Sequence, residues 1–329
     1  MTPVTPTAEL VLRGPGGEPV DLWRTFVSHG LTDLPPMLLD AEARSLEITL
    51  ALGGRHARTV RVAPGGPDRA TLTVLGRRVS RRELDAGVAA IAHVLRLDED
   101  LSGFYALVAD DPDLSWAASG AGRLVRSPTV FEDVVKTVCT TNCSWSATRR
   151  MVGALVEHLG QRAPTAPAEG PVGRAFPTPG AMAAAGEDFY RDVVRAGYRG
   201  RYLRALAESV ADGSVDVEAL GRATPEELPD DELAVRLQAL PGVGPYAAAH
   251  VMTLLGRYSR LILDSWTRPT YARLAGRATV TDATIARRFR RYGPWAGLAF
   301  WLYLTAEWAP LPQVDRGAPS APGSEALRR

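Results

Sequence analysis

Residues 240–250, Leu-Pro-Gly-Val-Gly-Pro-Tyr-Ala-Ala-Ala-His, constrain the fold more than any other stretch of this chain. Residues 230–239 before them carry leucines at the spacing of one helical face, so a helix leads into the stretch. Pro241 and Gly242 end that helix. Pro245 suits the first turn of a second helix, because its φ is fixed near the helical value and its missing N–H would be unpaired there. The sequence therefore predicts two helices joined by a tight turn, which we call the hairpin.

The hairpin offers a backbone that another molecule can approach closely. Gly242 and Gly244 carry no side chains, and the N–H groups that begin the second helix have no partners within it. Unpaired N–H groups at a helix start bind phosphate well. We therefore predict that Gly242, Gly244 and Tyr246 bind a nucleic-acid backbone, with an ordinary turn between helices as the alternative.

Downstream of the hairpin, the apolar run 261–263 ends in a single carboxylate, Asp264, just before the next helical pattern. A hairpin of this composition, followed by an apolar run and an aspartate, resembles the helix-hairpin-helix DNA glycosylase superfamily. The enzymes of that superfamily excise bases and carry a hairpin and a catalytic aspartate. The resemblance covers residues 40–308 and is strongest in 128–160 and 236–310.

Length and composition place the chain among globular proteins. Its 329 residues, 46% of them hydrophobic, predict two or three domains with real cores. No apolar run approaches the roughly 20 residues of a membrane span, and no positively charged start with an apolar core follows Met1. We expect a cytoplasmic, nucleoid-associated monomer with no membrane partner. Because the net charge is only +1, DNA binding must be local, and the arginine-rich segments 199–204 and 287–291 are candidates.

Three runs of alternating or β-branched residues, 47–52, 58–62 and 70–75, predict a small antiparallel sheet. From residue 81 the pattern becomes helical. We therefore predict an α+β fold with an N-terminal antiparallel sheet domain, an all-α two-lobed glycosylase core and a disordered tail, over residues 1–80, 81–309 and 310–329. The sheet is similar to the domain that precedes the helical core in the 8-oxoguanine and alkylbase branches of the superfamily.

A glycosylase breaks the bond between C1′ of the sugar and a base nitrogen, and positive charge develops on the sugar. A fixed carboxylate beside the sugar stabilises that charge and orients water, and Asp264 is predicted to do so. Bifunctional members of the superfamily carry a lysine two residues after the second hairpin glycine, where this chain has Tyr246. Lys136, the only lysine, lies in another helix. The resemblance therefore implies a monofunctional enzyme that leaves an abasic site.

Aromatic residues are expected around the flipped base. Tyr246 and His250 stand four positions apart after the turn, so they share a helical face. In alkylbase glycosylases these two positions carry the aromatic residues on which the base stacks. Trp301 and Tyr303 are further candidates for the pocket wall, with packing in the core as their alternative. Such a pocket favours a cationic ring, as in N-alkylated purines.

Asn142 lies between two predicted helices, 131–139 and 146–159. In the family this turn carries the side chain that fills the gap left by the flipped base, so Asn142 is the predicted DNA wedge, with an Asx turn as the alternative. The adenine-excising branch has a carboxylic acid one helical turn earlier, which protonates the leaving base, and this chain has Val138 there. A base that N-alkylation has already charged needs no such acid, so alkylated purines are favoured.

With only Cys139 and Cys143, the chain lacks the ligands of a four-cysteine iron–sulfur cluster. The resemblance implies no metal and no cofactor beyond, at most, a monovalent cation at the hairpin. The expected partner is double-stranded DNA with a damaged base. Two alternatives stay open: an 8-oxoguanine-type glycosylase without lyase activity, suggested by the sheet domain and the Gly-Tyr-Arg stretch 197–199, and a non-catalytic DNA-damage-binding protein. The sequence leaves the roles of Lys136 and His29 open.

Overall fold

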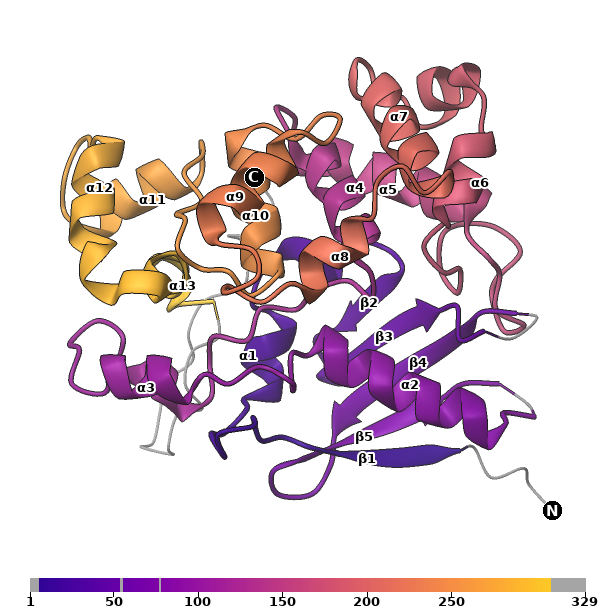
Figure 1. The fold of residues 1–329 in the computed structure, drawn as a ribbon. Helices are drawn as coiled ribbons and strands as arrows, with labels where there is room; N and C mark the ends of the chain where they lie inside the picture. The colour runs from indigo at the N-terminus through magenta and orange to yellow at the C-terminus, as the bar shows by residue number, and fades with distance from the viewer. Residues whose placement is uncertain (1–5, 54–55, 77, 309–329) are drawn as a thin grey trace.

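The computed structural model describes residues 6–53, 56–76 and 78–308. Its N-terminal part is a five-stranded antiparallel sheet in the order β1-β5-β4-β3-β2 (Figure 1). Most apolar residues of the central strands are buried, as in the pair Val62 and Leu72. The strands are β1 (Thr7–Val11), β2 (Met37–Asp40), β3 (Ser45–Leu50), β4 (Arg58–Pro64) and β5 (Arg69–Val74).

Helix α2 (Arg81–Val94) packs against this sheet. It begins with a capping box, in which the Ser80 hydroxyl accepts the Glu83 N–H and the Glu83 side chain accepts the Ser80 N–H. Leu84 and Ile91 share one hydrophobic core with the strands. The predicted domain boundary after residue 80 thus falls between the sheet and a helix that packs on it, and the boundary itself remains a prediction.

The remaining helices form two lobes, each around its own hydrophobic core. The first lobe holds α4 (Val130–Thr140), α5 (Trp145–Leu159), α6 (Pro179–Ala184), η3 (Phe189–Val193), α7 (Arg199–Ala211), α8 (Val217–Arg222), α9 (Asp230–Gln238) and α10 (Pro245–Leu254). The second lobe holds α3 (Ser102–Val108), η2 (Ser115–Ser119), α11 (Thr267–Leu274), α12 (Asp282–Phe289), η4 (Arg290–Trp295) and α13 (Ala296–Thr305). Two short helices, α1 (Leu22–Phe26) and η1 (Gly30–Asp33), lie within the N-terminal part.

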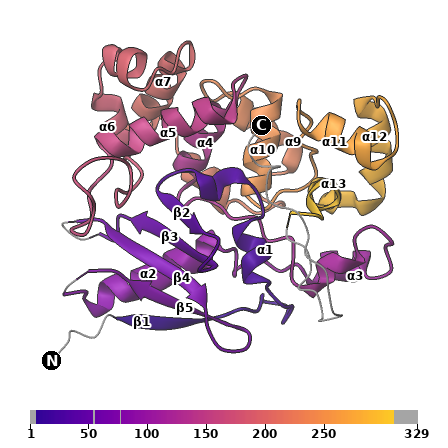
Figure 2. The same cartoon turned by 180° about the vertical axis from the view of Figure 1, so that it is seen from behind.

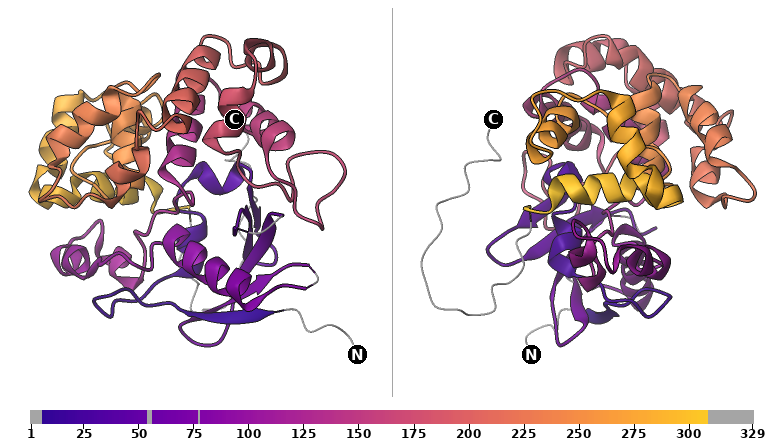
Figure 3. Two further views of the ribbon diagram at one scale, coloured as in Figure 1. Left: turned by 45° about the vertical axis from the view of Figure 1, so that its right-hand side comes forward. Right: turned by 90° about the vertical axis from the view of Figure 1, so that its left-hand side faces the viewer.

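Helices α4 to α13 lie together on one side of the N-terminal part. Seen from behind, α4 to α6 lie above the sheet, and α11 to α13 lie above α3 (Figure 2). The two views of Figure 3 show the same stacking of helices over sheet. Tyr246, at the start of α10, packs against the cores of both lobes, so the hairpin lies where the two lobes meet. None of the helices described here is both long and apolar enough to cross a bilayer.

The α+β class and the two-lobed helical core are confirmed. The predicted strands at 47–52, 58–62 and 70–75 correspond to β3, β4 and β5, each shifted by at most two residues at an end. The outer strands β1 and β2 were not singled out by the sequence, because each is short and only partly buried. The tail predicted for residues 310–329 lies outside the described residues.

Candidate active site

The hairpin has the predicted form. Helix α9 ends at Gln238, and Gly244 caps α10, whose first residue is Pro245. Gly242 has φ +79°, and a Cβ there would lie 2.9 Å from Cβ of Tyr202 on α7, so only glycine fits this position. Gly244 is different, because it is exposed and, apart from Gly244 itself and its two chain neighbours, no described residue has an atom within 4 Å of the place that its Cβ would take.

The start of α10 leaves its N–H groups available to an anion. No side chain caps this helix start, in contrast to α4, whose first turn is capped by the Thr129 hydroxyl. Uncapped N–H groups at the positive end of a helix dipole are a general anion site. The arrangement therefore suits a DNA phosphate beside Gly244, and phosphate binding at the hairpin remains a prediction.

Replacing Gly244 with leucine is expected to weaken binding to every duplex alike, by at least about tenfold, because one backbone hydrogen bond to a charged phosphate contributes about 1.5–3 kcal/mol and carries no sequence information. The open space around Gly244 means that the new side chain meets DNA rather than protein. Gly66→Leu is the matched control, since Gly66 also has open space, but in the β4–β5 turn. Fluorescence anisotropy with two unrelated duplexes measures both variants, and unchanged affinity for Gly244→Leu would mean that the hairpin is only a turn.

Asp264 lies in the loop between α10 and α11 and is partly buried. Its Oδ1 accepts hydrogen bonds from the N–H groups of Trp266 (2.8 Å) and Thr267 (2.7 Å), and its own N–H donates to the Thr267 hydroxyl (2.8 Å). Among the described residues no donor is bonded to Oδ2. One carboxylate oxygen of Asp264 thus holds the loop rigid, and the other is free to face a substrate.

Tyr246 and His250 lie within the electrostatic reach of Asp264. Their ring centroids are 6.1 Å apart with an interplanar angle of 61°. Burial raises the pKa of Tyr246, and the charge of Asp264 acts in the same direction. Burial lowers the pKa of His250 to about 4, although Asp264 acts to raise it. His250 is therefore uncharged at neutral pH, and its buried Nδ1 has no partner among the described residues.

The two residues predicted from the last helix lie in different surroundings. The Trp301 indole is buried, donates to the Ser28 carbonyl (2.8 Å) and lies 5.7 Å from the Trp266 ring. Tyr303 instead lies under the Arg288 guanidinium, 4.3 Å from its ring centroid, and packs on α11 and α12. Because the two positions differ by about 200° around a helix, Tyr303 does not share the surroundings of Trp301.

Trp266 was not identified as a site residue from the sequence. It is 38% exposed, and its ring packs at a tilt against the rings of Trp301 and Trp308. A large aromatic residue two positions after the predicted catalytic carboxylate was the available signal. Trp266 adds an indole to the exposed surface next to Asp264.

Asn142 occupies the turn between α4 and α5. It is exposed and has φ +49°, a left-handed conformation that asparagine tolerates better than most residues. Its side-chain amide donates to the Tyr198 hydroxyl (3.2 Å), and Arg199 donates to the Thr141 carbonyl (2.9 Å). The turn is thus held from α7, and the role of Asn142 as a wedge remains a prediction.

Asn142→Gly is expected to slow base release from duplex DNA by about tenfold and from single strands much less, because flipping costs a few kcal/mol of stacking and pairing only where a stack exists. Glycine adopts the left-handed backbone without strain, so the substitution removes only the side chain. Tyr198→Phe is the matched control, since it removes the hydrogen bond to the amide and keeps Asn142. Equal losses on paired and unpaired substrate would identify Asn142 as a turn residue only.

Lys136 and His29 are both buried, and their side chains contact other groups inside the protein. Lys136 Nζ lies 2.6 Å from a carboxylate oxygen of Glu132. His29 Nε2 lies 2.5 Å from the Val125 carbonyl, and its Nδ1 accepts the Leu31 N–H (3.2 Å). Burial lowers the pKa of His29 to about 3, so the ring is neutral. Both side chains are therefore bonded inside the fold, and neither is presented to a substrate.

Neither a protein-family model nor a curated protein matches this sequence, whereas solved structures do match the fold. The 3-methyladenine DNA-glycosylase from Archaeoglobus fulgidus aligns with a TM-score of 0.68 at 20% identity, over 91% of this chain and 98% of that one. MBOgg1 in complex with a low-affinity DNA ligand aligns with a TM-score of 0.69 at 18% identity, over 92% and 96%.

The 8-oxoguanine glycosylase/lyase of Clostridium acetobutylicum, in complex with double-stranded DNA that contains cytosine opposite 8-oxoguanine, aligns with a TM-score of 0.66 at 18% identity. That match covers 88% of this chain and 92% of the other. The chain therefore has the fold of the helix-hairpin-helix DNA glycosylases, as its sequence predicted.

Proposed function

We propose that this protein is a monofunctional DNA glycosylase that flips a damaged base out of duplex DNA, an N-alkylated purine, and hydrolyses its N-glycosidic bond. The observation that carries the proposal is the junction of the two lobes. There α10 places Tyr246 and His250 within reach of the charge of Asp264. One carboxylate oxygen of Asp264 accepts no hydrogen bond from the described residues.

Each residue of this junction has a place in the proposed reaction. Asp264 stabilises the positive charge that develops on the sugar and orients the attacking water. The base stacks on Tyr246, and the exposed start of α10 holds a backbone phosphate. Because His250 is neutral at neutral pH, it does not repel a cationic base. A base that already carries positive charge leaves without a protein acid, which agrees with Val138 one helical turn before the wedge.

The absence of lyase activity is supported by the surroundings of the only lysine. Tyr246 stands where the bifunctional members carry the lysine that attacks C1′. Lys136 is fully buried and paired with Glu132, so it has no path to a sugar. Water is therefore the nucleophile, and the product is an abasic site in an unbroken strand.

A second candidate is an 8-oxoguanine-type glycosylase without lyase activity. It is favoured by the Gly-Tyr-Arg stretch, because Tyr198 is hydrogen-bonded to the predicted wedge Asn142 and Arg199 holds the same turn. The fold resembles 8-oxoguanine and 3-methyladenine glycosylases about equally. A comparison of substrates separates the two candidates.

Single-turnover rates on duplexes that differ in one base test the proposal. Release of 3-methyladenine or 7-methylguanine is expected to be at least about tenfold faster than release of 8-oxoguanine or mismatched adenine, since cation–π stacking adds about 0.5–2 kcal/mol for a charged ring and the charged base is itself the better leaving group. Tyr246→Leu is expected to narrow this preference. Release of 8-oxoguanine with methylated purines untouched would support the second candidate instead.

A further inference from the structure

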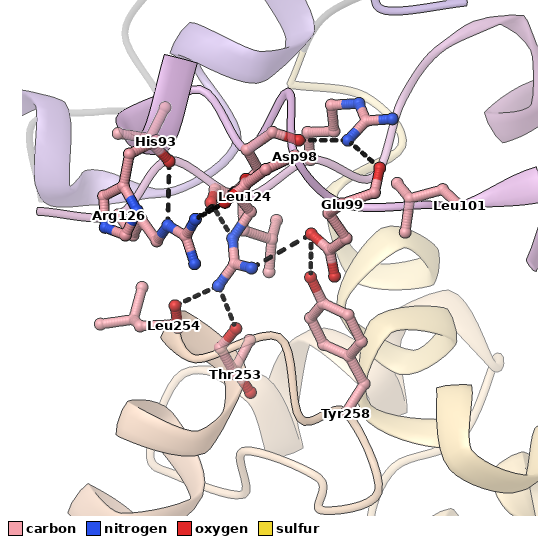
Figure 4. Close-up of polar contacts among 12 residues, drawn as sticks. His93, Asp98, Glu99, Leu101, Leu124, Arg126, Thr253, Leu254 and Tyr258 are labelled. Atoms are coloured by element: carbon pink, nitrogen blue, oxygen red, sulfur yellow. Dashed lines mark hydrogen bonds and ion pairs between the residues drawn. The ribbon is translucent and has the colours of Figure 1, made fainter. Parts of the chain in front are cut away.

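A fully buried arginine joins the N-terminal part to the far end of α10. Arg96, two residues after α2, is 1% exposed. Its guanidinium donates to the carbonyls of Leu124 (2.8 Å), Thr253 (3.1 Å) and Leu254. Figure 4 shows these carbonyls converging from two separate segments of the chain. Thr253 and Leu254 are the last two residues of α10.

This contact satisfies a general need of a helix end. The last four carbonyls of a helix lack partners within it, and the C-terminal end carries a partial negative charge. An arginine there supplies both hydrogen bonds and positive charge, and its planar fork fixes the direction of approach. Helix α10 has 10 residues and so spans about 15 Å. Its other end carries the hairpin and Tyr246.

The segment after α10 is tied to the same arginine. Glu99 accepts hydrogen bonds from Arg96 Nη1 (3.1 Å) and from the Tyr258 hydroxyl (3.0 Å). Gly256, which follows α10 with φ +81°, is so close that a Cβ there would lie 3.0 Å from Arg96 Nη1. The carboxylate balances the buried guanidinium charge, and the end of α10 is held on two sides (Figure 4).

From these contacts we infer that Arg96 is a positioning residue, which fixes α10 along its axis and thereby sets Tyr246 and His250 against Asp264. Asp264 lies on the loop that packs with the second lobe, so α10 and this loop must be held relative to each other by contacts outside the site. The link to base release rests on the proposed function. A displacement of about 1 Å at a reacting centre can slow a reaction a hundredfold.

Arg96→Lys tests this inference, because lysine keeps the charge and cannot reach all the carbonyls at once. Arg123→Lys is the matched control. Arg123 is equally buried and donates to the carbonyls of Arg96 and Glu99 and to the Glu18 carboxylate, and in the described structure none of its bonds reaches α10. Both variants are studied well below their midpoints of thermal unfolding.

Two readouts are measured on each variant. In Arg96→Lys the amides of residues 246–256 are expected to exchange hydrogen at least about tenfold faster than in the wild type and in Arg123→Lys. Single-turnover base release is expected to fall at least about tenfold in Arg96→Lys relative to Arg123→Lys. Affinity for an abasic-site analogue changes much less, because the hairpin itself is intact.

If Arg96→Lys does not fold, Gly256→Ala takes its place, since the added Cβ displaces the guanidinium. Its control is Gly276→Ala, because Gly276 follows α11 in the same left-handed conformation, with φ +63°, but has open space around it. Equal hydrogen exchange in the variant and its control would contradict the inference that Arg96 holds α10. Equal rates of base release in the two would contradict its effect on the reaction. A wild-type protein that releases no base would refute the proposed function, and the exchange comparison would still decide whether Arg96 holds α10.

Discussion

Asp264→Asn is expected to lower the single-turnover rate of base release by about 10²- to 10³-fold, the usual loss when one preorganised electrostatic group is removed from an active site. The substitution is nearly isosteric. The amide oxygen of asparagine still accepts the N–H groups of Trp266 and Thr267, so the loop keeps its shape while the negative charge is lost. Affinity for DNA with an abasic-site analogue is expected to stay within about threefold, since the phosphate contact belongs to the hairpin.

The matched control is Asp282→Asn. Asp282 also lies at the start of a helix, α12, and is ion-paired with Arg268 on the surface (2.7 Å). This variant tests whether the loss of any carboxylate near a helix start disturbs the enzyme. Turnover of Asp264→Asn within a few-fold of the wild type would contradict the assignment of Asp264.

Lys136→Met is expected to destabilise the protein by about 3–5 kcal/mol, the usual cost of leaving one member of a buried ion pair without its partner. Glu132 would remain buried next to Asp133, whose pKa burial raises to about 7. Chemical denaturation measures the loss. A variant as stable as the wild type would show that Lys136 does not hold this cluster together.

The loss of stability in Lys136→Met is expected to grow as the pH rises. Burial raises the pKa of Glu132, and Lys136 acts to lower it, so removal of the lysine raises it further. The folded state then keeps a proton that the unfolded state releases, and stability falls as the pH rises above the unfolded pKa of about 4.3. The double variant Lys136→Met/Glu132→Leu is the control, since replacing both partners with apolar residues restores stability. The fraction of Lys136→Met that stays folded is expected to release base normally.

The hairpin was predictable because its signals are local. Pro245 and the glycines before it fix the turn through backbone preferences alone, and the helices on either side follow their apolar spacing. The same holds for α4 and α5 around Asn142 and for the central strands. Short edge strands lack such a signal, because a strand of four residues gains its structure from the neighbour with which it pairs.

Contacts between distant segments were not predictable. Arg96 looks like a surface arginine after a helix, and only the fold brings Thr253 and Leu254 to it. Tyr303 depends on packing in the same way. Its aromatic ring suggests a pocket wall, which stays a prediction, and its position on α13 places it against α12 and under Arg288. Residue type indicates what a side chain can do, whereas the helix face and the packing decide where it acts.

The most direct test of the proposed function is product analysis of one duplex that carries a single 7-methylguanine. We predict free 7-methylguanine by mass spectrometry, a strand that stays intact until alkali is added, and no enzyme–DNA adduct after borohydride. Strand breakage without alkali, or a borohydride-trapped adduct, would contradict hydrolysis by water at a site that has Tyr246 in place of lysine. Failure to release 7-methylguanine, by protein that still binds the duplex, would contradict the proposed alkylpurine glycosylase and leave the 8-oxoguanine-type glycosylase or a DNA-damage-binding protein.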